Sequence, residues 1–197
     1  MKRLLGLALA LVSPAGAETL PQGERDRAMS HLHATRKLFI DSLAGVTKEQ
    51  WAWKPAPEVW SIAEVAEHIT VSEDNLFGLV KKVAATPLDP ALKPDKANDE
   101  KILKSLVDRT RKAQAPEFLK PGNRWKTPEE MVAHFKEARD KTIGYVQTTQ
   151  EDLRALASAH PRFGALDAYQ WLLLIAGHSE RHVLQLNEVK TLPGFPK

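Results

Sequence analysis

The chain has 197 residues, of which 43% are hydrophobic and 27% are charged, so a single domain can bury a hydrophobic core. It contains no cysteine. This excludes disulfide bonds, thiolate metal ligands, a catalytic thiol and a lipid anchor on cysteine, and leaves histidine and carboxylate side chains as the candidate metal ligands.

The first seventeen residues have the pattern of a signal peptide. Lys2 and Arg3 precede an apolar run over residues 4–12, and the small residues that end at Ala17 form a cleavage pattern. The run is too short for a membrane anchor, which needs about 20 helical residues. We therefore expect cleavage near Ala17 and an exported domain, periplasmic or secreted, over residues 18–197. Without Lys2 and Arg3 the domain has 26 basic and 25 acidic residues, a balance that argues against nucleic acid as a partner.

The first helix is predicted over residues 24–44, because Leu32, Phe39 and Leu43 are spaced to share one face. Gly45 then acts as a stop signal. The next connection cannot be one continuous helix because it contains two prolines. Its three indoles supply a large apolar area that we expect to close one end of the core (Trp51, Trp53, Pro55, Pro57 and Trp60).

The second helix has the clearest start in the sequence. Residues 61–64 (SIAE) form a capping box, in which the serine and glutamate side chains satisfy free backbone amides. The helix is predicted to run to about residue 85, and His68 flanks its apolar stripe (Ile62, Val65, Ile69, Leu76, Val80 and Val83). Prolines then open a loop. A shorter helix over residues 99–114 is predicted to lie over the side or end of the bundle.

Two further helices complete the predicted fold. Residues 127–130 (TPEE) form a second capping box and start the third helix, whose inner face is marked by six residues (Met131, Phe135, Ala138, Thr142, Tyr145 and Leu153). Residues 160–164 contain a proline and a glycine that break the helical pattern, and the last helix is predicted over residues 166–190. Because no segment shows sustained alternation of apolar and polar residues, the prediction is an all-α four-helix bundle with no strands.

The last helix places two histidines within its apolar stripe (Trp171, Leu174, Ile175, His178, His182, Gln185 and Val189). His178 and His182 are one turn apart, with Cβ atoms about 5–6 Å from each other, so both imidazoles can reach one metal ion. Two core histidines bonded to backbone or water are the alternative, which the spacing leaves open. His68 adds a third donor if the second helix lies beside the last one, although on its own it fits a surface position equally well.

Two segments carry a resemblance to a known family. Residues 60–68 (WSIAEVAEH) are similar to the W-S-x-x-E-x-x-x-H segment of DinB-like proteins, preceded as in that family by Trp51 and residues 54–55 (KP). Residues 178–185 (HSERHVLQ) resemble the late H-x-x-x-H-x-x-Q segment of the family. Both segments occur in the family's order and separation, and the resemblance extends from about residue 28 to residue 190.

The resemblance implies an up-down-down-up bundle in which His68, His178 and His182 bind one divalent ion, zinc or nickel foremost. Three nitrogen ligands with open positions are also typical of catalytic metal centres. The family includes metal-dependent hydrolases, thiol transferases that use low-molecular-weight thiols and members without an assigned activity, so the resemblance does not fix the reaction. An export signal departs from the family's usual cytoplasmic location, where small thiols are abundant, and argues against thiol transfer.

Other residues are weaker candidates. Gln185 lies on the histidine face and could orient a water or ligand, or simply fill the end of the bundle. Glu73 and Glu67 could support the site as carboxylates, although a solvated position on the helix surface is the plainer expectation. His134 lies at the edge of its stripe, where contact with the site is not expected. The remaining histidines are expected at the surface (His31, His33 and His160).

The resulting hypothesis is an exported metal-dependent hydrolase of a small substrate, in which the ion lowers the pKa of a bound water. The sequence shows no committed general base, so the catalytic residues are not identified. A non-catalytic ligand-binding or stress-related bundle is the first alternative, and a metal-dependent thiol transferase is the second. Each of these needs a small-molecule partner, and each leaves a homodimer open.

Overall fold

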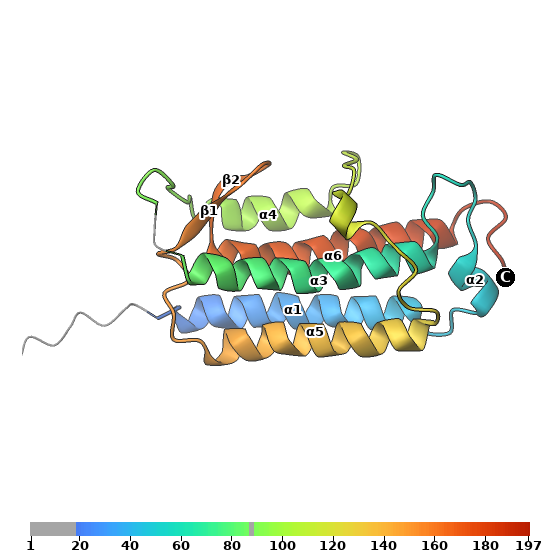
Figure 1. The fold of residues 1–197 in the computed structure, drawn as a ribbon, viewed down its shortest axis with the longest axis horizontal. Coiled ribbons are helices and arrows are strands. Elements are labelled where there is room, and N and C mark those ends of the chain that lie inside the picture. The colour runs from blue at the N-terminus through green and yellow to red at the C-terminus, as the bar shows by residue number, and fades with distance from the viewer. Residues whose placement is uncertain (1–18, 87–88) are drawn as a thin grey trace, which may run out of the picture.

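The computed structural model describes residues 19–86 and 89–197, so the expected signal peptide lies outside the described residues. Four long helices form the body of the molecule: α1 (Gln22–Leu43), α3 (Ile62–Ala84), α5 (Pro128–Thr148) and α6 (Ala168–Lys190). Helices α1 and α6 run in one direction, and α3 and α5 run in the opposite one (Figure 1). The predicted four-helix bundle with up-down-down-up topology is therefore confirmed.

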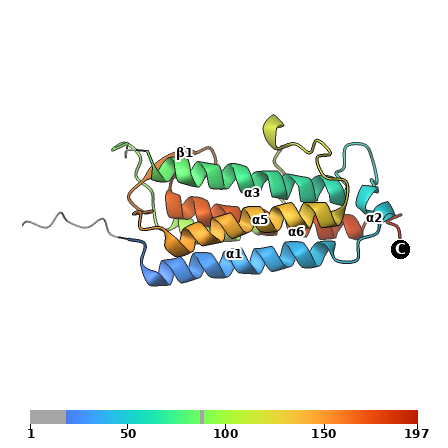
Figure 2. The same ribbon diagram turned by 60° about the horizontal axis from the view of Figure 1, so that its bottom comes forward.

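The four helices form a square in which α5 and α6 occupy opposite corners. Each of these two helices packs against both α1 and α3. Figure 2 shows α5 in front of the bundle and α6 behind it. None of the helices in residues 19–86 and 89–197 is both long enough and apolar enough to cross a membrane.

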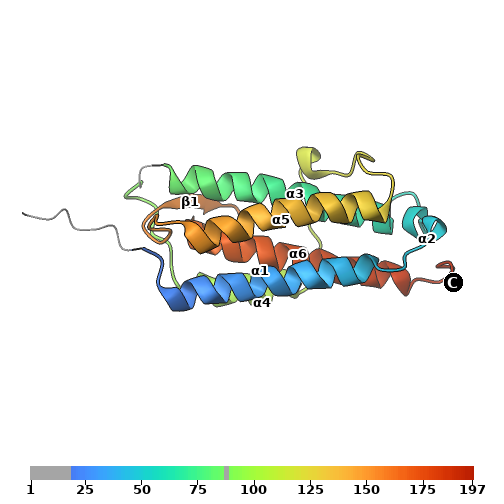
Figure 3. The ribbon, with the colours of Figure 1, turned by 90° about the horizontal axis from the view of Figure 1, so that it is seen from below.

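A shorter helix, α4 (Asn98–Val107), packs along the outside of α6. It lies on the side of the bundle away from α5 (Figure 3). The close approach of the two helices depends on Gly177, because a Cβ atom at that position would lie 2.8 Å from Cδ1 of Leu106. The predicted end of this helix at residue 114 is wrong. Asp108 leaves the helical conformation and its carboxylate accepts the backbone N–H of Thr110, a local turn that competes with another helical turn.

Side-chain caps explain where several helices begin. Ser61 and Glu64 form the predicted capping box at the start of α3. The capping box predicted at residues 127–130 is only half formed: Thr127 accepts from the backbone N–H of Glu130, but the Glu130 carboxylate accepts from the N–H of Lys126 and not from that of Thr127. Two further capping boxes were not predicted. Thr47 and Gln50 start the short helix α2 (Lys48–Ala52), and Asp167 and Gln170 start α6.

The expectation that the fold has no strands is wrong. Strands β1 (Ala157–His160) and β2 (Gly164–Asp167) form an antiparallel hairpin directly before α6. His160 Nδ1 accepts from the backbone N–H groups of Arg162 and Phe163, and Gly164 supplies a positive φ of 74° at the end of the turn. Strands of four residues are too short to show the alternation that sequence reasoning requires.

A buried polar layer crosses the middle of the bundle between two hydrophobic clusters. The guanidinium of Arg139 on α5 donates to both carboxylate oxygens of Glu73 on α3, each at 2.7 Å. It also donates to Thr35 Oγ1 on α1 at 2.7 Å and to Ser179 Oγ on α6 at 2.9 Å. One residue from the middle of each long helix thus takes part, and this layer fixes the relative height of the four helices because a shifted helix would leave a buried polar group unpaired.

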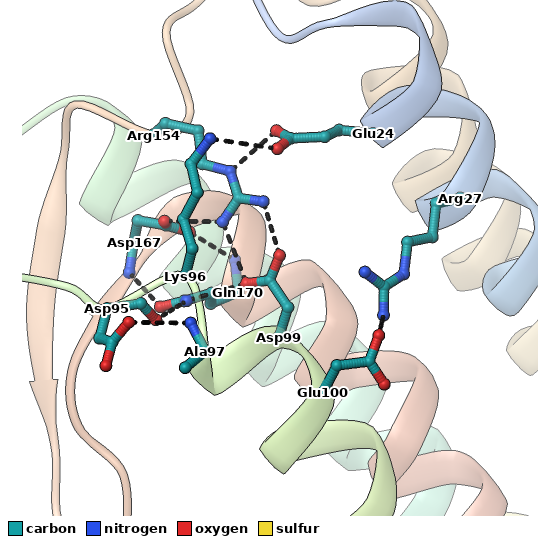
Figure 4. A network of polar contacts seen from close by, with 10 residues as sticks. All are labelled: Glu24, Arg27, Asp95, Lys96, Ala97, Asp99, Glu100, Arg154, Asp167 and Gln170. Atoms are coloured by element: carbon teal, nitrogen blue, oxygen red, sulfur yellow. Dashed lines mark hydrogen bonds and ion pairs between the residues drawn. The ribbon is translucent and has the colours of Figure 1, made fainter.

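A second polar network ties helix ends together at the end of the bundle where α1 and α6 begin. Arg154 follows α5 and donates to Glu24 on α1, to Asp99 on α4 and to Asp167, the N-cap of α6 (Figure 4). Gln170 donates to Asp99 at 2.9 Å and so joins α6 to α4. The network therefore anchors α4 and the chain before α6 to the four-helix core.

Candidate metal centre

Three histidines meet where α3 lies beside α6. His68 comes from α3, and His178 and His182 come from consecutive turns of α6. One ring nitrogen from each lies within 4.8 Å of the others, a group that could hold a metal ion. The ring centroids are 5.0 Å apart for His68 and His178, 4.5 Å for His68 and His182, and 4.4 Å for His178 and His182. The predicted juxtaposition of the second and last helices is thus present.

The environment favours neutral imidazoles. His68 is only 3% exposed, and burial lowers its pKa. Burial, followed by the charge of His68, lowers the pKa of His182 to about 3, and burial together with the two other histidines lowers the pKa of His178 well below its usual 6.5. Neutral imidazole is the form that binds a metal ion, so no proton has to be removed from these rings at neutral pH before an ion binds.

Two of the three rings are oriented by acceptors on the side away from the cluster. His68 Nδ1 donates to the carbonyl oxygen of Leu119 at 2.9 Å, and His182 Nδ1 donates to Oε1 of Gln185 at 2.8 Å. A proton held on Nδ1 leaves Nε2 with its lone pair available. Metal-binding histidines usually have such a partner, which fixes both the tautomer and the ring orientation. The donor set therefore fits a divalent ion of the kind that binds nitrogen ligands.

Gln185 is itself held in place. Its Oε1 also accepts from Nη1 of Arg109 at 3.3 Å, and Arg109 forms a two-point ion pair with Glu188, with both N–O distances at 2.7 Å. The Gln185 side chain therefore does more than fill the end of the bundle. The chain of contacts from Glu188 through Arg109 and Gln185 restricts the ring of His182.

Glu73 and Glu67 are both buried, so the expected solvated positions are wrong. Glu73 binds Arg139 and Thr142 in the polar layer. Glu67 accepts hydrogen bonds from the chain after residue 119. Neither contact involves a histidine of the cluster.

The other histidines lie outside the cluster. His134 pairs with Asp74, with Nε2 3.0 Å from a carboxylate oxygen, and is 39% exposed in its side chain. His33 is exposed, whereas His31 and His160 are half-buried. The expected surface position is wrong for His160, whose ring packs against Phe163 and Trp171.

Sequence reasoning missed several groups that border the centre. The ring of Trp60 packs against His68 with centroids 5.2 Å apart, and Arg181 is 7% exposed beside His182. The carbonyl of Leu119 belongs to a short 3-10 helix, η1 (Glu117–Leu119). A backbone carbonyl has no residue-specific signal, so only the fold could place it against His68.

The comparisons with known proteins agree with this architecture. The family model of the DinB superfamily matches residues 31–186. The uncharacterized protein YuaE of Bacillus subtilis (strain 168) is 28% identical over 163 residues, which are 82% of this chain and 96% of YuaE.

A solved structure shares the fold. It is that of YfiT from Bacillus subtilis, described as a probable metal-dependent hydrolase with an unusual four-helix bundle topology. The two structures align with a TM-score of 0.60 and 15% sequence identity, covering 94% of this chain and 97% of YfiT. The match of the family model to most of the chain identifies the protein as a member of the DinB superfamily.

Proposed function

We propose that this protein is an exported metal-dependent hydrolase of a small substrate, in which His68, His178 and His182 bind one divalent ion, zinc or nickel. The observation that carries the proposal is the meeting of one buried and two half-buried imidazoles, with ring nitrogens within 4.8 Å of one another, on two neighbouring helices of the bundle. The alternative is that the histidines are satisfied by hydrogen bonds within the protein alone. This explains the two Nδ1 contacts, but it does not explain why the three rings converge.

The chemistry of such a centre is that a divalent ion held by three nitrogen ligands polarises a substrate oxygen and lowers the pKa of a bound water. The residues of the chain supply the geometry. Leu119 and Gln185 hold two imidazoles by their Nδ1 atoms, and burial keeps the rings neutral. Trp60 packs on His68 and gives the centre an apolar wall. A rigid, partly dry setting strengthens electrostatic interactions with a substrate.

The comparison with YfiT supports hydrolysis as the class of reaction, since that protein of the same fold is described as a probable metal-dependent hydrolase. The absence of cysteine means that any thiol for group transfer has to come from another molecule. Because the thiol transferases of this family also use external low-molecular-weight thiols, the lack of cysteine does not decide between the two reactions. The comparison with YfiT and the proposed export, away from the abundant small thiols of the cytoplasm, are what favour hydrolysis.

The experiment is a metal analysis of the protein isolated from its own host, followed by a panel of ester, amide and thiol-transfer substrates with and without chelator. We expect about one divalent ion per chain and chelator-sensitive hydrolysis that returns when the ion is restored. Stoichiometric metal with turnover only in the thiol assays would replace hydrolysis with thiol transfer. Binding of a small ligand without turnover would identify a ligand-binding bundle.

Export is part of the proposal and has a separate test. The sequence pattern of residues 1–17 supports it. Cell fractionation and N-terminal sequencing should give a periplasmic or secreted protein that begins near Glu18. An intact Met1 on a cytoplasmic protein would contradict export and restore the argument for small cellular thiols.

A further inference from the structure

The chain between α4 and α5 contacts both helices that carry the three histidines. It leaves α4 after Val107, forms η1 and crosses α6 and α3 before it reaches Thr127 (Figure 1). We refer to residues 108–126 as the α4–α5 connection. The connection supplies the Leu119 carbonyl that accepts from His68, and Arg109, which contacts Gln185. The connection therefore supplies the acceptor that orients His68 and contacts the α6 side chain that orients His182.

One anchor of the connection is Glu67, the residue before His68. Glu67 is 2% exposed, and its carboxylate accepts the backbone N–H groups of Gly122 at 2.6 Å, Asn123 at 2.8 Å and Arg124 at 3.3 Å. The guanidinium of Arg124 also donates to it. Asn123 has a φ of 60°, a left-handed conformation that turns successive N–H groups toward one acceptor. A buried carboxylate needs such donors, so this contact fixes the connection tightly.

The other anchor is Arg181, the residue before His182. Its guanidinium donates to the carbonyl oxygens of Leu106 at 2.9 Å and Asp108 at 2.6 Å, and to that of Arg111. These three acceptors lie at the end of α4 and in the first residues of the connection. A planar guanidinium can serve several carbonyls at once, which a lysine ammonium on a flexible stem does less well.

The two anchors are complementary. Glu67 takes N–H groups at one end of the connection, whereas Arg181 donates to carbonyl groups at the other, and each is the neighbour of a histidine in the cluster. Within the described residues, neither side chain forms a hydrogen bond to a histidine of the cluster. Their effect on the cluster is therefore indirect, through the backbone they hold.

We infer that Glu67 and Arg181 are positioning residues that hold the α4–α5 connection over the metal centre and thereby set its affinity for the ion. The inference rests on the proposed metal centre. When the connection is in place, Leu119 keeps the proton of His68 on Nδ1, and Arg109 restrains Gln185, which does the same for His182. The Nε2 atoms of both rings are then unprotonated and held in one orientation for the ion. Because an ordered connection raises the affinity for the ion, thermodynamic linkage requires that the bound ion in turn favours the ordered connection.

The test uses the mature chain, zinc as the probe, and two variants matched in charge. Glu67→Gln removes one anchoring acceptor, and Asp74→Asn removes one carboxylate from the exposed side of the same helix. Zinc affinity is measured by competition with a chromophoric chelator, and hydrogen exchange of residues 117–124 is followed with and without zinc. We expect Glu67→Gln to weaken zinc binding by about 10- to 100-fold, as loss of an outer hydrogen-bond partner does, and to abolish the zinc-induced protection of residues 117–124.

The unsubstituted chain and Asp74→Asn should bind zinc equally well and show that protection. Equal zinc affinity in Glu67→Gln and Asp74→Asn would overturn the inference while leaving the metal centre intact. Failure of the unsubstituted chain to bind zinc would remove both. If Glu67→Gln does not fold, Arg181→Lys decides the matter by the same two readouts, with the loss of protection expected at residues 106–111.

Discussion

The Nδ1 atom of His182 and the Oε1 atom of Gln185 are 2.8 Å apart, one helical turn from each other on α6. The amide oxygen can only accept, so the ring proton sits on Nδ1 and the lone pair of Nε2 remains available. The family-like spacing of H-x-x-x-H-x-x-Q is thus explained in this chain by geometry, because a glutamine three residues after a histidine reaches its ring.

Replacing Gln185 should weaken the metal centre without destroying it. In Gln185→Ala, the ring of His182 loses its acceptor, and we expect zinc affinity to fall by about 10- to 100-fold. Gln185→Glu retains an acceptor at the same place and should keep tight binding. Competition titrations of both variants measure the effect. Equal affinities in the alanine and glutamate variants would show that the contact has no influence on the ion.

Removing a histidine of the cluster should abolish stoichiometric metal binding. His178→Ala and His182→Ala each leave two donors where a tight site needs three or more. The fold should survive, because apolar burial along four helices supplies most of the stability. His134→Ala serves as the control, since this histidine pairs with Asp74 outside the cluster. Metal content by elemental analysis and helicity by circular dichroism are the measurements, and full occupancy in either cluster variant would refute the ligand assignment.

Breaking the polar layer should cost more stability than any change at the cluster. Arg139 is fully buried and its partner Glu73 is 1% exposed, so Arg139→Leu leaves a carboxylate without its counter-ion. We expect the free energy of unfolding to fall by about 3–5 kcal/mol, as for other broken buried pairs. The double variant with Glu73→Leu should recover part of this loss. Urea unfolding checks both, and a double variant less stable than the single one would contradict the explanation.

The sequence was sufficient for the main elements of the fold. Capping boxes and apolar stripes identify local features, so the starts of α3 and α5 could be predicted from a few adjacent residues. The candidate cluster was accessible for a similar reason, since His178 and His182 share a helical face, although His68 required the resemblance to a family. What these patterns miss are contacts between distant segments. The sequence predicts surface positions for Glu67 and Glu73, because the residues that pair with them in the fold, 122–124 and 139, are distant along the chain.

The hairpin before α6 should loosen in mild acid because of His160. Burial, followed by the charge of Arg162, lowers the pKa of His160 below its usual 6.5, and its neutral Nδ1 accepts two backbone N–H groups in the turn. As the pH falls below about 6.5, the unfolded chain takes up a proton at this residue before the folded chain does. The free energy of unfolding therefore decreases with falling pH until the folded ring is also protonated.

His160→Asn isolates this contribution. Asparagine keeps an oxygen that can accept the N–H two residues ahead, but it does not titrate. The variant is expected to be less stable at pH 7, since it lacks the ring that packs on Phe163 and Trp171. Its free energy of unfolding should nevertheless fall less than that of the unsubstituted chain between about pH 7 and about pH 5, a range that includes the usual pKa of histidine. Urea unfolding at several pH values gives the two slopes, and an NMR titration gives the pKa of His160 directly. Identical slopes, or a pKa at or above 6.5, would mean that the turn does not depend on the neutral ring.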